Sequence, residues 1–193
     1  LKSPSKINLN LKILKFDQHW KKHKLSSRIS ILKLSDEIKV IKSKKLSIKY
    51  NFPNKNLKIS NDIISKTIKF FDKKYKTKSN FNIQVIKNIP IGYGLGGGSS
   101  NAATILKFLY SYHGIDSNNF YLDSPLLGSD ILLFIDLRPK IIDGIKNVKF
   151  LTSNNPRWKK IYLIIPKKKN LTREIFNHYK NNKPKINFKR SKN

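Results

Sequence analysis

The chain has 193 residues, enough for one domain with a substantial core, or for one domain and part of a second. It contains no cysteine and only 4 histidines, which excludes disulfides, thiolate nucleophiles and cysteine-ligated zinc. No apolar run approaches the length of a membrane span, and no apolar N-terminal segment resembles a secretion signal, so neither insertion nor secretion is indicated.

The net charge of +30 comes from 41 lysines and arginines against 11 acidic residues. Such an excess is compatible with a polyanionic partner such as a nucleic acid. However, nearly all of it is lysine, spread along the chain beside abundant asparagine and isoleucine. That distribution is typical of a coding bias toward A and T, so nucleic-acid binding is the weaker interpretation.

The N-terminal part predicts mainly strands. Residues 6–13 alternate between apolar and polar side chains, which predicts a half-buried strand with Lys6 and Asn8 on the wet face. Residues 16–27 have no clean period and are predicted to form a loop. Three further strands of a meander are then expected, starting at Ile29, at 38–41 and at 46–50.

Asp36 and Glu37 are placed in a turn between two of these strands. The next segment has apolar residues at helical spacing from Ile64 to Tyr75, with Asn61 as a candidate cap. Residues 81–85 then alternate again and predict a strand that leads through Pro90 into a glycine-rich stretch.

Five of the chain's 8 glycines fall between Gly92 and Gly98. Directly after them, Ser99 and Ser100 are good capping residues for a helix expected over residues 101–113, with Gly114 as its stop. A glycine-rich loop that leads into a helix N-terminus directs unpaired backbone N–H groups and the positive helix end at one spot. That arrangement suits a phosphate, and the simplest ligand is a nucleotide.

The C-terminal part is less regular. Residues 120–127 are predicted to form a short helix and residues 131–137 a buried strand. Asp130, at the start of that apolar run, is either a turn or cap residue or a functional acid. Another strand is expected at 158–165, and a helix capped by Thr172 follows it.

Two common phosphate-binding motifs do not fit the loop. A P-loop has a lysine immediately before its serine or threonine, whereas Gly98 precedes Ser99 here. The bare dinucleotide pattern G-x-G-x-x-G is present, but Pro90 separates the strand from the loop and no acidic residue follows at the expected distance.

The stretch from Pro90 to Ala103, with its Gly-Leu-Gly-Gly-Gly-Ser-Ser sequence, resembles the ATP-binding loop of the small-molecule kinases related to galactokinase, homoserine kinase, mevalonate kinase and phosphomevalonate kinase. Within this superfamily it is most similar to the 4-diphosphocytidyl-2-C-methyl-D-erythritol kinases. Residues 5–9, 128–130 and 166–176 resemble further segments of that family in the same order and spacing.

The resemblance implies an α+β fold, the ribosomal protein S5 domain 2-like N-terminal lobe of these kinases. Residues 1–155 would form this lobe, residues 156–180 the start of a C-terminal lobe, and residues 181–193 a disordered tail rich in lysine and asparagine. Family members continue well past the equivalent of residue 193. The chain is therefore expected to be a fragment or an eroded copy.

The resemblance also implies the site. Lys6 and Asp130 match the catalytic pair, and Asn8, His23 and Thr172 match substrate-binding positions. Ser99 or Ser100 would serve the phosphates and Mg²⁺. The ATP-binding residues would be Pro90, Ile91, Gly92, Tyr93, Gly94, Leu95, Gly96, Gly97, Gly98, Ser99 and Ser100.

The implied activity is ATP-dependent phosphorylation of the 2-hydroxyl of 4-diphosphocytidyl-2-C-methyl-D-erythritol, a step of the methylerythritol phosphate route to isoprenoids. The implied setting is cytoplasmic, the partner a small-molecule substrate, and the cofactors ATP and Mg²⁺. Two alternatives stay open. One is a kinase of another small alcohol, and the other is a degenerate remnant that binds nucleotide or nucleic acid without catalysis.

Overall fold

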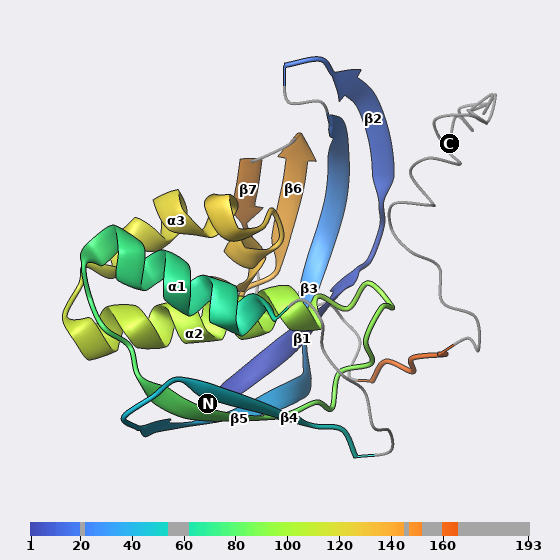
Figure 1. Ribbon diagram of the computed structural model, residues 1–193. Helices are drawn as coiled ribbons and strands as arrows, with labels where there is room; N and C mark the ends of the chain where they lie inside the picture. Colours follow the sequence, from blue (N-terminus) through green and yellow to red (C-terminus); the bar gives the residue numbers. More distant parts are fainter. Residues whose placement is uncertain (20–21, 54–61, 145–146, 152–159, 166–193) are drawn as a thin grey trace, which may run out of the picture.

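The computed structural model describes residues 1–19, 22–53, 62–144, 147–151 and 160–165. The strands and helices form an α+β arrangement (Figure 1). In chain order the elements are β1 (Lys2–Asn8), β2 (Lys12–Asp17), β3 (Lys22–Lys42), β4 (Ser47–Asn51), α1 (Ile63–Tyr75), β5 (Phe81–Ile86), α2 (Gly97–His113), η1 (Ser117–Asn119), α3 (Phe120–Leu127), η2 (Ile131–Phe134), β6 (Lys140–Gly144) and β7 (Asn147–Phe150).

Strand β3 is the centre of a seven-stranded sheet. The sheet runs in the order β4-β5-β3-β6-β7, and β1 and β2 also pair with β3. All pairings are antiparallel except that of β4 with β5, which are joined through α1. Because β3 is 21 residues long, one end of it forms an arm with β2 while the other end lies in the main sheet (Figure 1).

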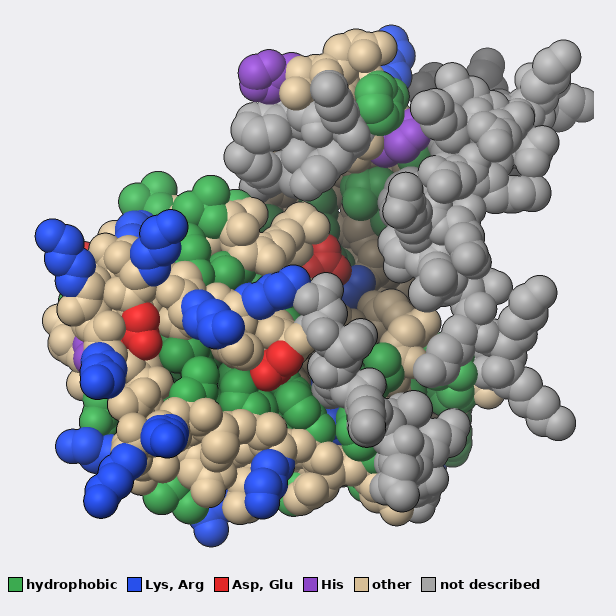
Figure 2. Space-filling view, viewed as in Figure 1, with side chains coloured by type: hydrophobic (Ala, Val, Ile, Leu, Met, Phe, Trp, Pro, Cys, Tyr) green, Lys and Arg blue, Asp and Glu red, His purple; other side chains and the backbone are tan. Residues whose placement is uncertain are grey.

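The helices gather on one side of this sheet, with α2 packed against α1, β1 and η2 (Figure 1). The core between helices and sheet is mainly aliphatic, with Phe71, Phe81 and Tyr110 among its aromatic residues. Among the described residues, no helix is long and apolar enough to cross a membrane. Basic side chains lie scattered over the visible face in Figure 2 and do not form one continuous stripe.

The predictions for the glycine loop and the elements beside it are confirmed, except for the start of α2. Helix α1, strand β5 and helix α3 lie where the periodicity placed them. Helix α2 ends as predicted at Gly114, which is in the left-handed conformation, but it begins at Gly97 and not at residue 101. The predicted cap Asn61 lies outside the described residues, and Asp62 occupies the N-cap of α1, where its side chain accepts from the Ile64 N–H.

The predictions for the first strands are partly wrong. The segment 6–13 does not form one strand, because β1 ends at Asn8 and β2 begins only at Lys12. At the break, Asn10 accepts hydrogen bonds from the Arg28 N–H and the Ser27 hydroxyl, both at 2.6 Å, and Leu11 is exposed. The predicted loop over 16–27 instead contains the end of β2 and the start of β3.

The predicted meander is also wrong. The segments starting at Ile29 and at 38–41 are one continuous strand, and β4 pairs in parallel with β5. Asp36 is therefore not in a turn but fully buried in the middle of β3. It is tolerated there because its carboxylate accepts hydrogen bonds from Lys87 and from the Ile89 N–H.

The apolar run that starts at Ile131 forms the 3-10 helix η2 followed by bends, not a strand. Its backbone bonds, such as Leu133 N–H to Asp130 O at 3.2 Å, close three-residue turns. An apolar run is compatible with a helix or with a strand, and the length of so short a segment does not distinguish the two. The described part of the predicted strand 158–165 is irregular, with Ile164 highly exposed, and the helix at Thr172 lies outside the described residues.

Lys140 on β6 anchors the segment that follows Asp130. Its side chain is fully buried, and Nζ donates to the carbonyls of Leu133 at 2.6 Å and Asp136 at 2.8 Å. Burial lowers the pKa of Lys140 from 10.5 to about 8, and the nearby Asp136 carboxylate only partly offsets this.

A second buried polar group joins the three helices. Asp123 of α3 is fully buried, and its carboxylate accepts from Lys74 of α1, from Tyr75 at 2.8 Å and from Tyr110 of α2 at 2.6 Å. Burial, and then the hydrogen bond to Asp123, raise the pKa of Tyr75 and of Tyr110. Both hydroxyls therefore keep their protons and remain donors.

We expect Asp123→Asn to lower the free energy of unfolding by about 1–3 kcal/mol, because an amide cannot accept from all three donors and loses the charge that pairs with Lys74. Denaturant unfolding monitored by circular dichroism measures the change. The control is Asp143→Asn at an exposed position of β6, which should change it by less than about 0.5 kcal/mol. Equal stabilities of the two variants would contradict this role of Asp123.

The pKa of Lys140 predicts a pH dependence of stability. Between about pH 8 and 10.5 the unfolded chain binds the Lys140 proton and the folded chain does not, so stability rises with pH in this window. In this window the free energy of unfolding of the wild type, relative to that of Lys140→Met, should rise by up to roughly 1.4 kcal/mol per pH unit. Below about pH 8 this difference should not change with pH. Unfolding curves at several pH values test this, with Lys149→Met at an exposed position of β7 as the control.

Candidate active site

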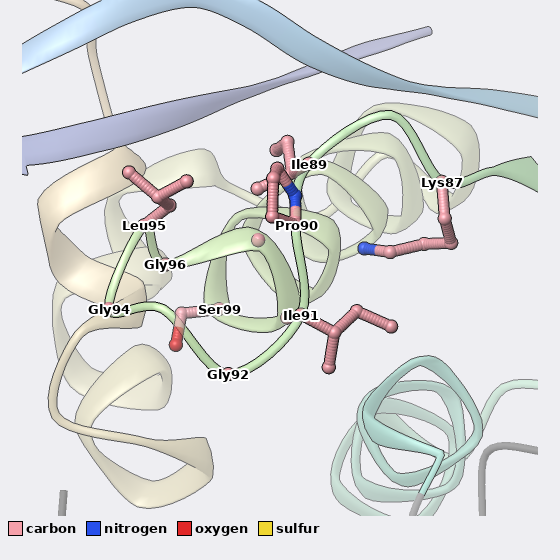
Figure 3. Close-up of a pocket in the computed structure, with 11 residues that line it drawn as sticks. Lys87, Ile89, Pro90, Ile91, Gly92, Gly94, Leu95, Gly96 and Ser99 are labelled. Carbon is pink, nitrogen blue, oxygen red and sulfur yellow. The ribbon is translucent and has the colours of Figure 1, made fainter. Parts of the chain in front are cut away.

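The glycine loop between β5 and α2 encloses a cavity of about 220 Å³ (Figure 3). Gly92, Gly94 and Gly96 have positive φ angles of 88°, 73° and 73°, which side-chain-bearing residues rarely adopt. The cavity is lined by Lys87, Ile89, Pro90, Ile91, Gly92, Gly94, Leu95, Gly96, Gly97, Gly98 and Ser99. Most of the predicted ATP-binding residues thus face one space.

Helix α2 begins at Gly97, earlier than predicted. Gly96 is its N-cap, and the Ser100 N–H donates to the Gly96 carbonyl at 2.8 Å. Ser99 and Ser100 therefore lie in the first turn and do not cap the helix. The reason is the left-handed backbone of Gly96, which turns the chain into the helix without a side-chain cap.

The two serines differ in their surroundings. Ser99 is partly exposed and lines the cavity. Ser100 is fully buried, and its hydroxyl accepts a hydrogen bond from Ser3 of β1 at 2.8 Å. Of the two, only Ser99 therefore presents its hydroxyl to the cavity, whereas Ser100 ties the helix to the sheet.

Lys6 of β1 lies directly beside the loop. Its backbone N–H donates to the Leu95 carbonyl at 2.9 Å. A Cβ atom at Gly96 would lie 3.0 Å from Cγ of Lys6 and 2.8 Å from the ring of Phe134. This close approach requires glycine at position 96, and it brings β1, the loop and η2 together.

The predicted pair of Lys6 and Asp130 is brought together by the fold. Nζ of Lys6 lies 3.8 Å from the Asp130 carboxylate and donates to the Asn8 side-chain oxygen at 2.7 Å. The Lys6 side chain is 10% exposed and that of Asp130 is 45% exposed, so the ammonium is enclosed while the carboxylate faces outward. Asp130 lies in a turn and occupies the N-cap position of η2, as the turn or cap alternative expects, but its side chain makes no capping hydrogen bond and stays available to a ligand.

A second lysine, which the sequence reading missed, lines the cavity. Lys87 follows β5 and lies at the cavity with the loop residues (Figure 3). It is buried and forms an ion pair with Asp36. Little in the sequence points to this ion pair. Lys87 lies three positions before Pro90, and Asp36 is one of only 11 acidic residues in the chain, but 51 residues separate the two.

His23 lies apart from these residues, on the arm of β3. It is paired across the strands with Phe16 of β2, and the two rings are in edge-to-face contact at 5.1 Å. Along β3 six residues separate it from Ile29, the partner of Asn8, which corresponds to ~20 Å. Thr172 lies outside the described residues.

Among the described residues, no group of three or more His, Asp or Glu side chains is arranged to bind a metal ion. Ser99 supplies a hydroxyl oxygen to the cavity, and Asp130 supplies a carboxylate beside Lys6, whose backbone N–H bonds the loop at Leu95. A hard cation would accept these together with phosphate oxygens, which is how Mg²⁺ is usually held beside nucleotides.

Comparison with known proteins gives a family. Residues 62–122, which include the loop and α2, match the model of the GHMP kinases N terminal domain. The 4-diphosphocytidyl-2-C-methyl-D-erythritol kinase of Ureaplasma parvum is 32% identical over 138 residues, covering 70% of this chain and 52% of the relative. That of Francisella philomiragia is 36% identical over 187 residues, covering 90% and 63%.

Solved structures agree in fold. A crystal structure of 4-(cytidine 5'-diphospho)-2C-methyl-D-erythritol kinase superposes with a TM-score of 0.64 at 23% identity, covering 78% of this chain and 54% of that one. The Methanococcus jannaschii mevalonate kinase superposes with a TM-score of 0.54 at 14% identity, covering 79% and 55%.

The chain spans between about half and just under two thirds of the length of these curated relatives, 52% and 63% in the two cases above. The part that matches the family model contains the glycine loop. The chain is thus similar to the GHMP kinases in its family-model match over residues 62–122, in its curated relatives and in its fold.

Proposed function

We propose that this chain forms the nucleotide-binding lobe of an ATP-dependent kinase that phosphorylates the 2-hydroxyl of 4-diphosphocytidyl-2-C-methyl-D-erythritol in the cytoplasm. The observation that carries the proposal is the junction between the loop and β1. Lys6 pairs with Asp130 through its side chain, and its backbone N–H donates to the Leu95 carbonyl of the loop. A phosphate in the loop and a hydroxyl at Asp130 would therefore be neighbours.

Each residue has a role that its surroundings support. The partly exposed Asp130 carboxylate would accept the proton of the acceptor hydroxyl as the new O–P bond forms and the bond to ADP breaks. Lys6 would stabilise the charge on the transferring phosphoryl group. Asn8 would orient Lys6 by accepting the 2.7 Å hydrogen bond from its Nζ. Asn8 would also bind the substrate.

The loop and the start of α2 would hold the phosphates. The positive-φ glycines leave open space at Gly94, where an added Cβ would meet nothing within 4 Å. Backbone N–H groups and the positive end of a 17-residue helix favour anionic oxygens there. Mg²⁺, when bound, would neutralise phosphate charge, and Ser99 is the hydroxyl placed to contact it.

The acceptor is proposed from the relatives' names and from the arm. Both curated relatives above are named as kinases of 4-diphosphocytidyl-2-C-methyl-D-erythritol. His23 would contact the cytosine, as the family resemblance implies. Its distance along β3 from the Asn8 pairing requires an extended substrate, and a polyol linked through a diphosphate to a nucleoside is extended.

We expect Asp130→Asn to lower kcat by about 10²–10⁴-fold, because an amide cannot accept the hydroxyl proton. Coupled measurement of ADP release with the purified acceptor tests this, and Asp143→Asn at an exposed position of β6 is the matched control. Near wild-type turnover of Asp130→Asn would remove Asp130 from the mechanism.

A panel of other small alcohols tests the acceptor itself. Faster transfer to another member of the panel would replace the proposed substrate. Binding of ATP without transfer to any of them would favour the non-catalytic remnant.

Ser99→Ala and Ser100→Ala should separate binding from folding. Ser99→Ala removes a hydroxyl at the cavity and is expected to raise the KM for Mg·ATP about tenfold with little change in stability. Ser100→Ala removes the buried partner of Ser3 and should lower the free energy of unfolding by about 1 kcal/mol. Steady-state kinetics and denaturant unfolding of both variants measure the two effects. The reverse pattern would assign the cavity hydroxyl to Ser100.

A further inference from the structure

A buried polar cluster joins the two ends of the glycine loop to the sheet. It consists of Asp36 from the middle of β3, Lys87 from the loop entrance and Asn101 from the second turn of α2. Their exposed fractions are 0%, 8% and 2%. We name these three residues the loop clamp.

At the loop entrance, the two oxygens of the Asp36 carboxylate hold different groups. Oδ2 forms the ion pair with Nζ of Lys87, and Oδ1 accepts from the Ile89 N–H at 2.9 Å. Ile89 immediately precedes Pro90, where the loop begins. One buried carboxylate thus fixes both the side chain and the backbone that lead into the loop.

At the loop exit, Asn101 completes the cluster. With its amide nitrogen directed at β3, it donates to Asp36 Oδ2 at 2.9 Å and to the Gly97 carbonyl at 2.8 Å, and its oxygen accepts from Lys87 Nζ at 3.2 Å. This orientation matches every donor with an acceptor. Gly97 is the first residue of α2, so the same cluster also fixes the end of the loop.

The segment between these anchors is rich in glycine and has three residues at positive φ. Glycine has the widest backbone freedom, so such a segment loses much entropy when it is ordered around a ligand. Fixing both of its ends in advance reduces that loss on binding. The clamp is therefore placed to act on nucleotide affinity as well as on stability.

We propose that Asp36, Lys87 and Asn101 are positioning residues that preorganise the glycine loop for the nucleotide phosphates. The inference rests on the proposed function as an ATP-binding lobe. Lys87 acts through its partners, because its side chain is only 4% exposed and its ammonium is paired with the Asp36 carboxylate. Lys6 remains the cation beside the transferring group.

The test compares Asp36→Asn, Lys87→Met and the double variant Asp36→Val/Lys87→Met. Each single variant leaves a buried charge or donor without its partner, whereas the double variant removes both charges together. The matched control is Asp123→Asn, since Asp123 is equally buried and also pairs with a lysine but lies among α1, α2 and α3. The Kd for a non-hydrolysable ATP analogue with Mg²⁺ is measured at a temperature where all variants are folded.

We expect Asp36→Asn and the double variant to raise this Kd at least tenfold, and Asp123→Asn to change it less than twofold. In steady-state kinetics the KM for ATP should rise while the KM for the acceptor does not. The melting temperature of the double variant should recover part of the loss seen in the single variants. A double variant with wild-type Kd, or a control that weakens binding equally, would overturn the proposal.

Amide hydrogen exchange separates this proposal from the proposed function. If the wild-type chain binds no ATP analogue, the proposed function fails, and the clamp is then judged by exchange in residues 92–98. At least tenfold faster exchange in Asp36→Asn, with no change in Asp123→Asn, supports the clamp. Unchanged exchange in Asp36→Asn refutes it.

Discussion

The rest of the structure depends on how closely the glycine loop approaches β1 and η2. The Lys6 N–H to Leu95 carbonyl bond sets the loop against the sheet, and the absence of a side chain at Gly96 lets Phe134 pack against it. These contacts place the proposed phosphate cradle, the lysine and Asp130 within one small region. They come from three segments that are far apart in the sequence, so the site exists only in the folded chain.

The acidic residues in a chain of net charge +30 mostly serve the protein's own donors. Asp36 and Asp123 are buried acceptors for lysines, and Asp62 and Asp72 accept from hydroxyl and backbone groups around α1. Asp130 differs from these four. Its side chain caps nothing, lies 3.8 Å from Lys6 and is nearly half exposed. In a protein with so few carboxylates, an acid held in this way fits a role toward a ligand better than a role in folding.

Local signals explain what the sequence predicted well. The glycine loop, α1, α2, α3 and β5 depend on periodicity and on turn residues within short windows, and apart from the start of α2 these were placed correctly. Asp36 was misplaced because an acidic pair reads as a turn unless its partner is known, and that partner, Lys87, lies 51 residues away. The alternation around Lys6 and Asn8 suggested a solvated face, but the loop covers Lys6. For Lys6 and Asp130 the family resemblance supplied what periodicity could not.

Strand β3 connects these parts of the structure. Along its 21 residues it pairs in succession with β2, β6, β1 and β5, so each stretch of it is hydrogen-bonded to at least one neighbour. It carries His23 on the arm, pairs with Lys6 and supplies Asp36 beneath the loop. Separating any one of these from the others requires breaking the ladder of this strand. The arm, the lysine and the loop anchor are therefore linked through the backbone hydrogen bonds of one strand.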